Sequence, residues 1–156
     1  MLKPRLQRLF EEYADAHRHP TNRLTHKIAI PLIVFHIVAM LDWVHLFGGV
    51  TLAWVAFALA IGWYLTLDVR LALLMVVLYG ACFPLGWITP RWLVVVIAVA
   101  AWLIQLAGHL VWEKKQPAFF TNLLQALIGP FFFAAVLVGL WPPKRVEAGA
   151  TAKQAG

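Results

Sequence analysis

Long apolar stretches separated by short polar breaks dominate the chain. Gly48 and Gly49 form one break, Asp68 and Arg70 mark a second, and a third precedes Arg91. Each interval is about long enough to cross a ~30 Å hydrocarbon core, which takes roughly 20 helical residues. The pattern predicts four spans, at residues 28–47, 50–67, 69–87 and 90–111, and a fifth apolar stretch at 119–141.

The fifth stretch differs from the other four because Gly129 and Pro130 interrupt it. Proline in a helix interior removes a hydrogen bond and clashes with the preceding turn. The sequence leaves open whether this stretch spans the membrane or forms a re-entrant or broken helix hinged at Pro130. The tail at 142–156 is predicted to be disordered.

The first 27 residues follow another pattern. Apolar side chains recur at helical spacing over residues 1–16, and charged ones occupy most of the other positions. This predicts an amphipathic helix on the membrane surface or against the bundle. Pro20 ends the pattern, so residues 1–27 are expected to form this helix and a histidine-containing elbow.

Composition agrees with a membrane protein. Hydrophobic residues make up 62% and charged residues 13% of the 156 positions, whereas soluble domains are roughly 45–50% apolar and about 25% charged. We therefore predict one all-α domain over residues 1–141, a polytopic membrane helix bundle with four to five transmembrane segments, whose partner is the lipid bilayer. The first 27 residues lack a signal-peptide core, so the first span is expected to direct insertion.

The net charge of +6 does not indicate nucleic-acid binding, because six of the thirteen basic residues precede residue 28. Basic flanks favour the cytoplasmic side. The N-terminus is therefore expected in the cytoplasm, with the protein in a bacterial inner membrane, or in the endoplasmic reticulum if eukaryotic. Four crossings return the chain to that side, so His26 and His109 should meet at the same cytoplasmic interface.

Ionisable groups at membrane depth usually mark a functional site. Gln105, His109 and Glu113 are spaced four apart and share one helix face, while the break at Pro20 can turn His17 and His26 toward one point. Imidazoles with a carboxylate suit non-haem Fe²⁺, with zinc as the main competitor. The single cysteine, Cys82, excludes an internal disulfide and a cysteine-based zinc site.

Structural explanations remain open for several of these residues. Asn22 can cap the following helix or hydrogen-bond an imidazole. Gln105 can join helices by a hydrogen bond, and Glu113 can be solvated beside its lysines. His19 is expected in the exposed elbow, His36 inside the bundle and His45 at the far end of the first span.

Two motif blocks and a third segment carry a family resemblance. They are Tyr13…His17…Asn22…His26…Ile30-Pro31, then Gln105…Gly108-His109…Glu113…Pro117-Ala118, and then Asn122-Leu123-Leu124-Gln125-Ala126-Leu127…Pro130-Phe131. Over roughly residues 10–135 the chain resembles the 2-hydroxy fatty acid dioxygenase family of small membrane proteins. The middle spans match only in being apolar.

The resemblance implies Fe²⁺-dependent α-oxidation, in which a 2-hydroxy fatty acid and O₂ give a fatty acid one carbon shorter. It places the metal on His17, His26 and His109, and it matches Glu113 to a family carboxylate, here a ligand or base. Asn22 and Gln105 would support the site as further catalytic residues. His19 stands where the family often has Asn, so it is not counted as a ligand.

A 2-hydroxy acid can chelate iron through its carboxylate and hydroxyl, and its acyl tail needs an apolar groove. The carboxylate also needs a cation at the interface. The predicted substrate-binding residues are Arg23, Lys27 and Lys114, with Arg18 and Lys115 as further candidates.

Rival functions remain. One is another lipid-acting metalloenzyme, although desaturase boxes of the H-x₃-H and H-x₂-H-H type are absent and the chain has only six histidines. A second is a non-enzymatic membrane scaffold or transporter-associated protein with structural histidines, and a third is a b-haem protein. Metal content separates these possibilities, and the sequence does not indicate an oligomeric state.

Overall fold

The structure is a computed structural model that describes residues 2–117, 122 and 124–142. Helices dominate these residues, which confirms the predicted all-α class. In chain order the elements are α1 (Pro4–Asp15), α2 (Pro20–Asp42), β1 (His45–Phe47), β2 (Val50–Thr51), α3 (Leu52–Leu67), α4 (Val69–Ile88), α5 (Arg91–Ala107), the π-helical turn η1 (Gly108–Glu113) and α6 (Leu124–Leu137). The tail predicted to be disordered lies outside the described residues from position 143 onward.

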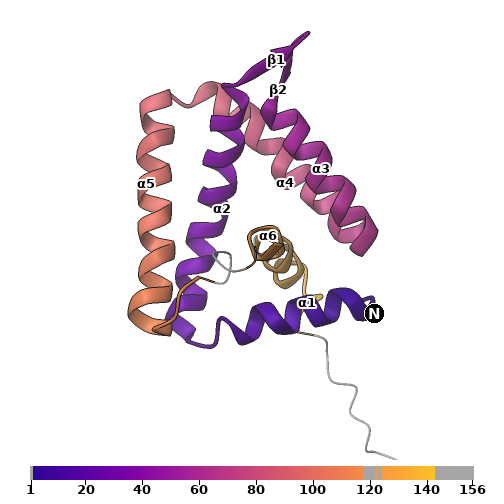
Figure 1. The fold of residues 1–156 in the computed structure, drawn as a ribbon, viewed down its shortest axis with the longest axis vertical. Coiled ribbons are helices and arrows are strands. Elements are labelled where there is room, and N and C mark those ends of the chain that lie inside the picture. Colours follow the sequence, from indigo (N-terminus) through magenta and orange to yellow (C-terminus); the bar gives the residue numbers. More distant parts are fainter. Residues whose placement is uncertain (1, 118–121, 123, 143–156) are drawn as a thin grey trace, which may run out of the picture.

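Four helices stand upright and alternate in direction (Figure 1). Helix α2 rises from the elbow, α3 descends, α4 rises beside it, and α5 descends to η1. An even number of passes therefore separates His26 from His109. Both residues lie at the lower end of the bundle, beside the elbow, as the sequence predicts.

Among the described residues, three helices are long and apolar enough to cross a membrane: Pro20–Asp42, Val69–Ile88 and Arg91–Glu113, the last of which joins α5 and η1. Helix α3 has only 16 residues, but it must carry the chain back because α2 and α4 run in the same direction. Large apolar side chains such as Leu59 (71% exposed) and Leu103 (63% exposed) face outward, as a lipid-facing surface requires. The membrane-bundle prediction is confirmed, with three full-length helices rather than four.

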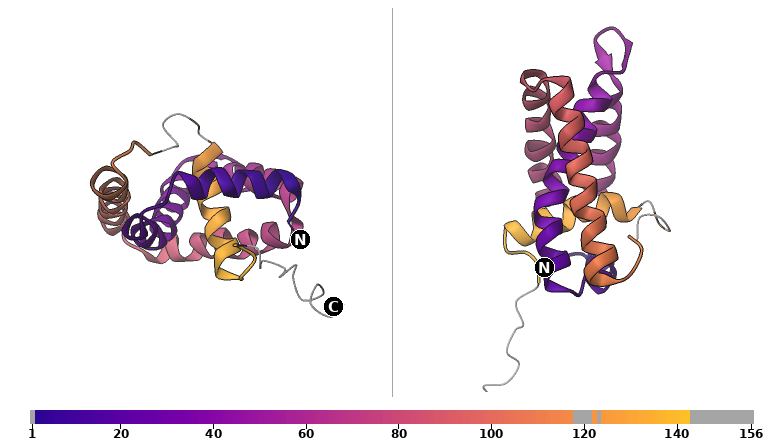
Figure 2. Two further views of the ribbon diagram at one scale, coloured as in Figure 1. Left: turned by 90° about the horizontal axis from the view of Figure 1, so that it is seen from below. Right: turned by 90° about the vertical axis from the view of Figure 1, so that its left-hand side faces the viewer.

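Helices α1 and α6 lie across the lower end of the upright helices (Figure 2). Helix α6 runs without a break through Pro130 and has only 14 residues. Of the possibilities that the sequence leaves open, the described residues therefore do not show a helix broken at Pro130. At about 1.5 Å per residue the helix is also too short for a ~30 Å core.

The buried core lies where α1 and α6 pack against the lower ends of α3 and α4. Leu6 and Phe10 of α1 are fully buried, which confirms the amphipathic pattern and places α1 against the bundle. The ring of Tyr64 stacks on Phe131 with centroids 4.4 Å apart. The Tyr64 hydroxyl donates a 2.7 Å hydrogen bond to the carbonyl of Leu127, which joins α3 to α6.

The first upright helix differs from its predicted limits. It begins at Pro20 and ends at Asp42, and the next residues form the β1–β2 ribbon. The Asp42 carboxylate accepts hydrogen bonds from Thr51 Oγ1 (2.7 Å) and Trp87 Nε1 (2.8 Å), which join the helix end to two neighbouring segments. The turn predicted at Gly48 and Gly49 is confirmed, with φ of 50° and 81°.

Candidate metal centre

Three histidines from three segments converge at the lower end of the bundle. His17 lies in the elbow between α1 and α2, His26 lies in the second turn of α2, and His109 lies in η1. One ring nitrogen of each lies within 4.8 Å of the others. This is the one group of three or more histidine, cysteine or acidic side chains close enough to hold a metal among the described residues.

Hydrogen bonds fix the orientation of two of the rings. His17 Nδ1 lies 2.6 Å from the carbonyl oxygen of Tyr13, and His26 Nδ1 lies 2.7 Å from that of Asn22. A carbonyl only accepts, so each Nδ1 carries the proton and each Nε2 keeps its lone pair. Metal-binding histidines commonly have this arrangement.

The ring of His109 lies next to the other two rings. His109 Nε2 lies 3.0 Å from His26 Nε2, and His109 Nδ1 is buried without a hydrogen-bond partner among the described residues. The three ring centroids are 4.5, 4.7 and 4.9 Å apart. One nitrogen of each ring thus borders the same small volume, which can hold a single metal ion.

The cluster is shielded from solvent. His17, His26 and His109 are 6%, 4% and 2% exposed. Burial lowers the pKa of His17 because the charged imidazolium loses its hydration. A neutral imidazole is the form that binds a metal, so the environment of His17 favours a ligand role.

Glu113 joins η1 to the elbow. Its Oε1 accepts from the backbone N–H of Arg18 at 3.1 Å, and its Oε2 accepts from the N–H of His19 and from Asn22 Nδ2, both at 3.0 Å. Both oxygens therefore hold the elbow in place. No hydrogen bond joins Glu113 to His109 within the described residues. The role of Glu113 as ligand or base stays a prediction.

The capping role considered for Asn22 falls to another residue. His19 is the N-cap of α2, and its Nδ1 accepts the N–H of Thr21 at 3.2 Å. Asn22 instead bonds Glu113 through its side chain and His26 through its carbonyl. Sequence reasoning missed this cap, although Pro20 at the first helical position was a signal for it.

Gln105 reaches the cluster from α5. Its Nε2 lies 2.7 Å from His26 Nε2, while its Oε1 is buried and has no partner among the described residues. The face shared by Gln105, His109 and Glu113 therefore turns toward α2 and the elbow. An amide with a free acceptor beside the metal position can hydrogen-bond a molecule that enters the site.

Gly108 allows η1 to approach α2 closely. A Cβ at this position would run into Thr25 Oγ1 and Asn22 Oδ1. Short π-helical turns within α-helices often occur at functional sites, and this one carries His109 and Glu113. The Gly108-His109 pair thus combines a close backbone contact with a candidate ligand.

Two cavities adjoin the cluster and share Tyr13, His17 and Ile30 as lining residues. The first, which we call the vestibule, has about 460 Å³ and carries three cations. Its other walls come mainly from α6 and the residues after it. The lining residues are Tyr13, Ala14, His17, Arg18, Arg23, His26, Lys27, Ile30, Phe132, Phe133, Val136, Trp141 and Pro142.

Arg23 and Lys27 therefore line the same cavity as His17 and His26, and their role in binding a carboxylate stays a prediction. Lys114 lies elsewhere: it follows η1 in a left-handed conformation (φ 55°) and lines neither cavity. Arg18 also lines the vestibule and forms an exposed ion pair with Asp15 at 3.0 Å.

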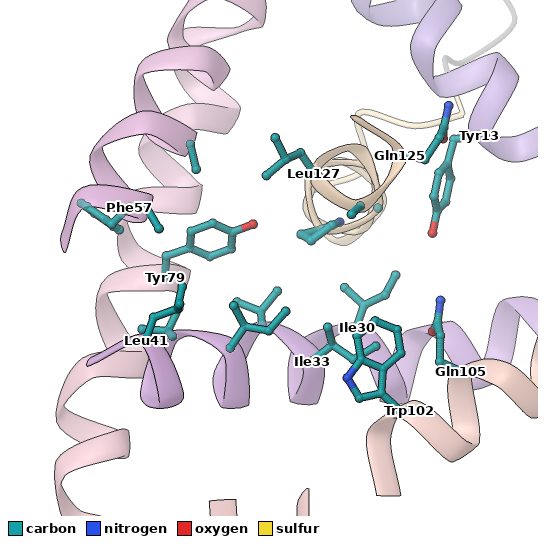
Figure 3. A pocket seen from close by; sticks show the side chains of 18 of the residues that line it. Tyr13, Ile30, Ile33, Leu41, Phe57, Tyr79, Trp102, Gln105, Gln125 and Leu127 are labelled. Carbon is teal, nitrogen blue, oxygen red and sulfur yellow. The ribbon is translucent and has the colours of Figure 1, made fainter. Parts of the chain in front are cut away.

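The second cavity, which we call the chamber, has about 240 Å³ and a mostly apolar lining from α2, α3 and α6. His17, Gln105 and His109 belong to its polar end. Figure 3 places Tyr13 and Gln105 at one end and Leu41, Phe57 and Tyr79 at the other.

Tyr13 is a site residue whose role sequence reasoning missed. Its ring stacks on His17 with centroids 4.1 Å apart, its carbonyl accepts from the same histidine, and it lines both cavities. Its position four residues before His17 was the available signal.

The remaining histidines lie apart from the cluster. His36 is buried in α2, where its Nδ1 lies 3.0 Å from the carbonyl of Leu32. This agrees with a hydrogen bond inside the bundle. His45 is exposed on the ribbon, at the opposite end of the bundle, and Cys82 is a buried free thiol.

Fold and site together define a small membrane helix bundle with a buried three-histidine candidate metal centre at one end. Residues 4–140 match the family model described as 2-hydroxy-palmitic acid dioxygenase Mpo1-like, and the chain belongs to that family. A relative from Saccharomyces cerevisiae, named 2-hydroxy-palmitic acid dioxygenase MPO1, is 32% identical over 126 residues, which cover 77% of this chain and 72% of the relative. No solved structure matches the chain. The resemblance inferred from the motifs is thus confirmed.

Proposed function

We propose that the protein is an Fe²⁺-dependent dioxygenase that shortens 2-hydroxy fatty acids by one carbon. The observation that carries the proposal is the convergence of three buried imidazoles, with ring nitrogens within 4.8 Å of one another. The family name adds the substrate class, because it describes a 2-hydroxy-palmitic acid dioxygenase.

The donor set supports iron. Imidazole ligands with open positions suit Fe²⁺ and zinc, and no thiolate contributes here. When bound, Fe²⁺ supplies the one-electron chemistry that activates O₂, which zinc cannot supply. Three protein ligands leave positions for a substrate, and His17, His26 and His109 are the residues that would hold the ion.

The overall reaction balances with one O₂. A 2-hydroxy acid and O₂ give the acid one carbon shorter, one CO₂ and one water. The carbon that bears the hydroxyl becomes the new carboxyl carbon, the original carboxyl carbon leaves as CO₂, and O₂ accepts the four electrons released. The carboxylate and hydroxyl must therefore lie beside the histidine cluster during the reaction.

The chain's own residues have distinct roles in this proposal. Arg23 and Lys27 attract the substrate carboxylate from the vestibule. The free Oε1 of Gln105 accepts a hydrogen bond from the substrate hydroxyl. Glu113 and Asn22 keep His26 and the elbow in position.

We also propose that the histidine cluster and the N-terminus face the cytoplasm. The basic residues of the elbow, together with Lys114 and Lys115 after η1, lie at the same lower end of the bundle. Such residues favour the cytoplasmic side. The substrate is an amphiphile that partitions into the bilayer, so a site at this interface can receive it from the membrane.

The test combines metal content with turnover. The purified protein is loaded with Fe²⁺ without oxygen, and iron per chain is counted for the parent and for His17→Ala, His26→Ala and His109→Ala. We expect about one iron per parent chain and its loss in each variant, because each removes a ligand. The matched control is His45→Ala, which removes an exposed histidine far from the cluster.

Oxygen and 2-hydroxypalmitate are then added, and the parent and the control should release a C15 acid while the three variants do not. Circular dichroism separates ligand loss from misfolding. Iron without a C15 product would overturn the substrate assignment. A parent that binds zinc but not iron, or binds no metal, would overturn the dioxygenase proposal and favour a structural role for the histidines.

A further inference from the structure

The two cavities have opposite character and meet at the metal position. The vestibule carries Arg18, Arg23 and Lys27, whereas the described residues that line the chamber include no lysine, arginine or acidic side chain. Both include His17. A molecule that places an anion in the vestibule and an apolar chain in the chamber must therefore pass the histidines at the point where its polar and apolar parts join.

We propose that the chamber holds the acyl tail and that an alanine face of α3 sets the preferred chain length of the substrate. The face consists of Ala53, Ala56 and Ala60. This inference rests on the proposed function for the identity of the head group. It adds where the tail lies and which residues determine its preferred length.

The alanine face follows from helix geometry. Positions 53, 56 and 60 are spaced three and four apart, so their side chains share one side of α3, and all three line the chamber. Other sides of the same helix carry large residues such as Trp54 and Leu59, which are exposed. The chamber is open because methyl groups stand where larger side chains would fill it.

The chamber also has a direction. Helix α2 lines it from Ile30, beside the histidines, to Leu41. These eleven steps along a helix cover about 16 Å, the length of an extended chain of about a dozen carbons. Helix α3 runs in the opposite direction to α2 (Figure 1), so Ala60 lies nearer the histidines and Ala53 lies nearer the far end.

The chamber is not sealed along its whole length, because the lining residue Ile37 is 41% exposed. Longer tails can continue past this side chain into lipid. The chamber should therefore set a preference and not an absolute limit. Each methylene moved out of a buried apolar site changes affinity about fourfold.

The experiment measures binding separately from turnover. Chains from C10 to C20 of the 2-hydroxy acid compete with radiolabelled 2-hydroxypalmitate for the Zn²⁺-loaded protein in lipid nanodiscs, without oxygen. The variants are Ala53→Leu, Ala60→Leu and Phe57→Ala. The matched control is Ala58→Leu, which places the same side chain on an exposed position of the same helix.

Ala53→Leu should weaken binding of the longest chains that fit the chamber by at least tenfold and leave the shortest unchanged. Ala60→Leu should weaken nearly all lengths, because it lies closer to the histidines. Phe57→Ala enlarges the chamber and should shift the preference to longer chains. This shift is opposite in direction to that of the leucine variants, so a general loss of folding cannot explain both results.

The outcomes separate the two proposals. Parent-like length profiles in all three chamber variants, or the same change in the Ala58→Leu control, would overturn the alanine face as the length determinant, even with C15 production intact. A parent that binds none of the acids would also overturn it. Binding with the expected shifts, but without O₂-dependent product after iron loading, would uphold the chamber and overturn the dioxygenase proposal.

Discussion

One carboxylate holds the elbow against the end of the fourth upright helix. Glu113 accepts from two backbone N–H groups and from Asn22, which in turn accepts from His26 through its carbonyl. Charged hydrogen bonds of this kind are roughly twice as strong as neutral ones. Glu113 is therefore linked to the histidines through the backbone that carries them, and we expect it to position them.

Glu113→Ala should keep one iron per chain at saturating Fe²⁺ but bind it about 10–100-fold more weakly, as is usual when an outer partner of a ligand is removed. Iron titration of the purified protein measures this. Glu12→Ala, which removes an exposed carboxylate of α1, should bind iron like the parent. Complete loss of iron at saturation in Glu113→Ala would instead identify Glu113 as a ligand.

The sequence predicts more about the ligands than about their support. Pro20 indicates a break that lets His17 and His26 converge, and the even number of crossings brings His109 to the same end of the bundle. The partners of Glu113 are backbone N–H groups of Arg18 and His19, and only the folded elbow directs these toward η1. Spacing along a chain carries no information on such contacts.

Among the elements, η1 depends most on a close approach. Its backbone at Gly108 lies against side chains of α2, so that a Cβ would collide with Thr25 Oγ1 and Asn22 Oδ1. Neither atom is at the free end of a long flexible chain. The separation of η1 and α2 therefore fixes the distance between His109 and His26.

Gly108→Ala should lower the free energy of unfolding by about 1–3 kcal/mol, as overpacking of a close contact does, and should also weaken iron binding. Denaturant unfolding and iron titration measure the two effects. Gly62→Ala is the control, because a Cβ there meets nothing within 4 Å, and alanine is the better helix former. Parent-like iron affinity in Gly108→Ala would show that this contact does not position His109.

The limits of a helix were predicted well where the length of an apolar stretch alone determines them. Helices α4 and α5 with η1 fall within two residues of their predicted spans. The ribbon after Asp42 was missed because a short apolar run fits a strand or a helix equally well. The sequence also leaves the course of α6 at Pro130 open, because neighbouring helices can satisfy the backbone groups that proline leaves free.

At the scale of the whole molecule, the bundle has two unlike ends. The lower end carries the elbow, η1 and the crossing helices α1 and α6, and the upper end carries the ribbon, whose residue Phe47 is 73% exposed. The histidine cluster belongs to the lower end only. Opposite membrane faces should therefore expose different segments.

Single cysteines introduced into a Cys82→Ser background test this arrangement in intact cells. A membrane-impermeant maleimide should label Phe47→Cys from outside, and should label Lys3→Cys and Lys115→Cys only after the membrane is opened. The reverse pattern would contradict the cytoplasmic placement of the site. Labelling of all three from one side would contradict a bundle that crosses the membrane.

The cavities could not be predicted from the sequence. An apolar groove for the tail was expected, but its walls come from α2, α3 and α6, whose relative positions follow from tertiary packing. In the sequence alone, the alanines of α3 cannot be distinguished from other small residues of a transmembrane helix. Their proposed role in setting chain length follows only from the folded structure, in which α2 and α6 form the other walls of the chamber.

The separation of 83 positions between His26 and His109 also sets the order of events during synthesis. The first two histidines leave the ribosome well before the third, and three further passes of the chain must be in place before the cluster can close. Until then a nascent chain can offer a metal only two of its three imidazoles. In the proposed enzyme, tight metal capture therefore reports that the four upright helices have been inserted and folded, and a chain that lacks one of these passes would fail to retain the ion.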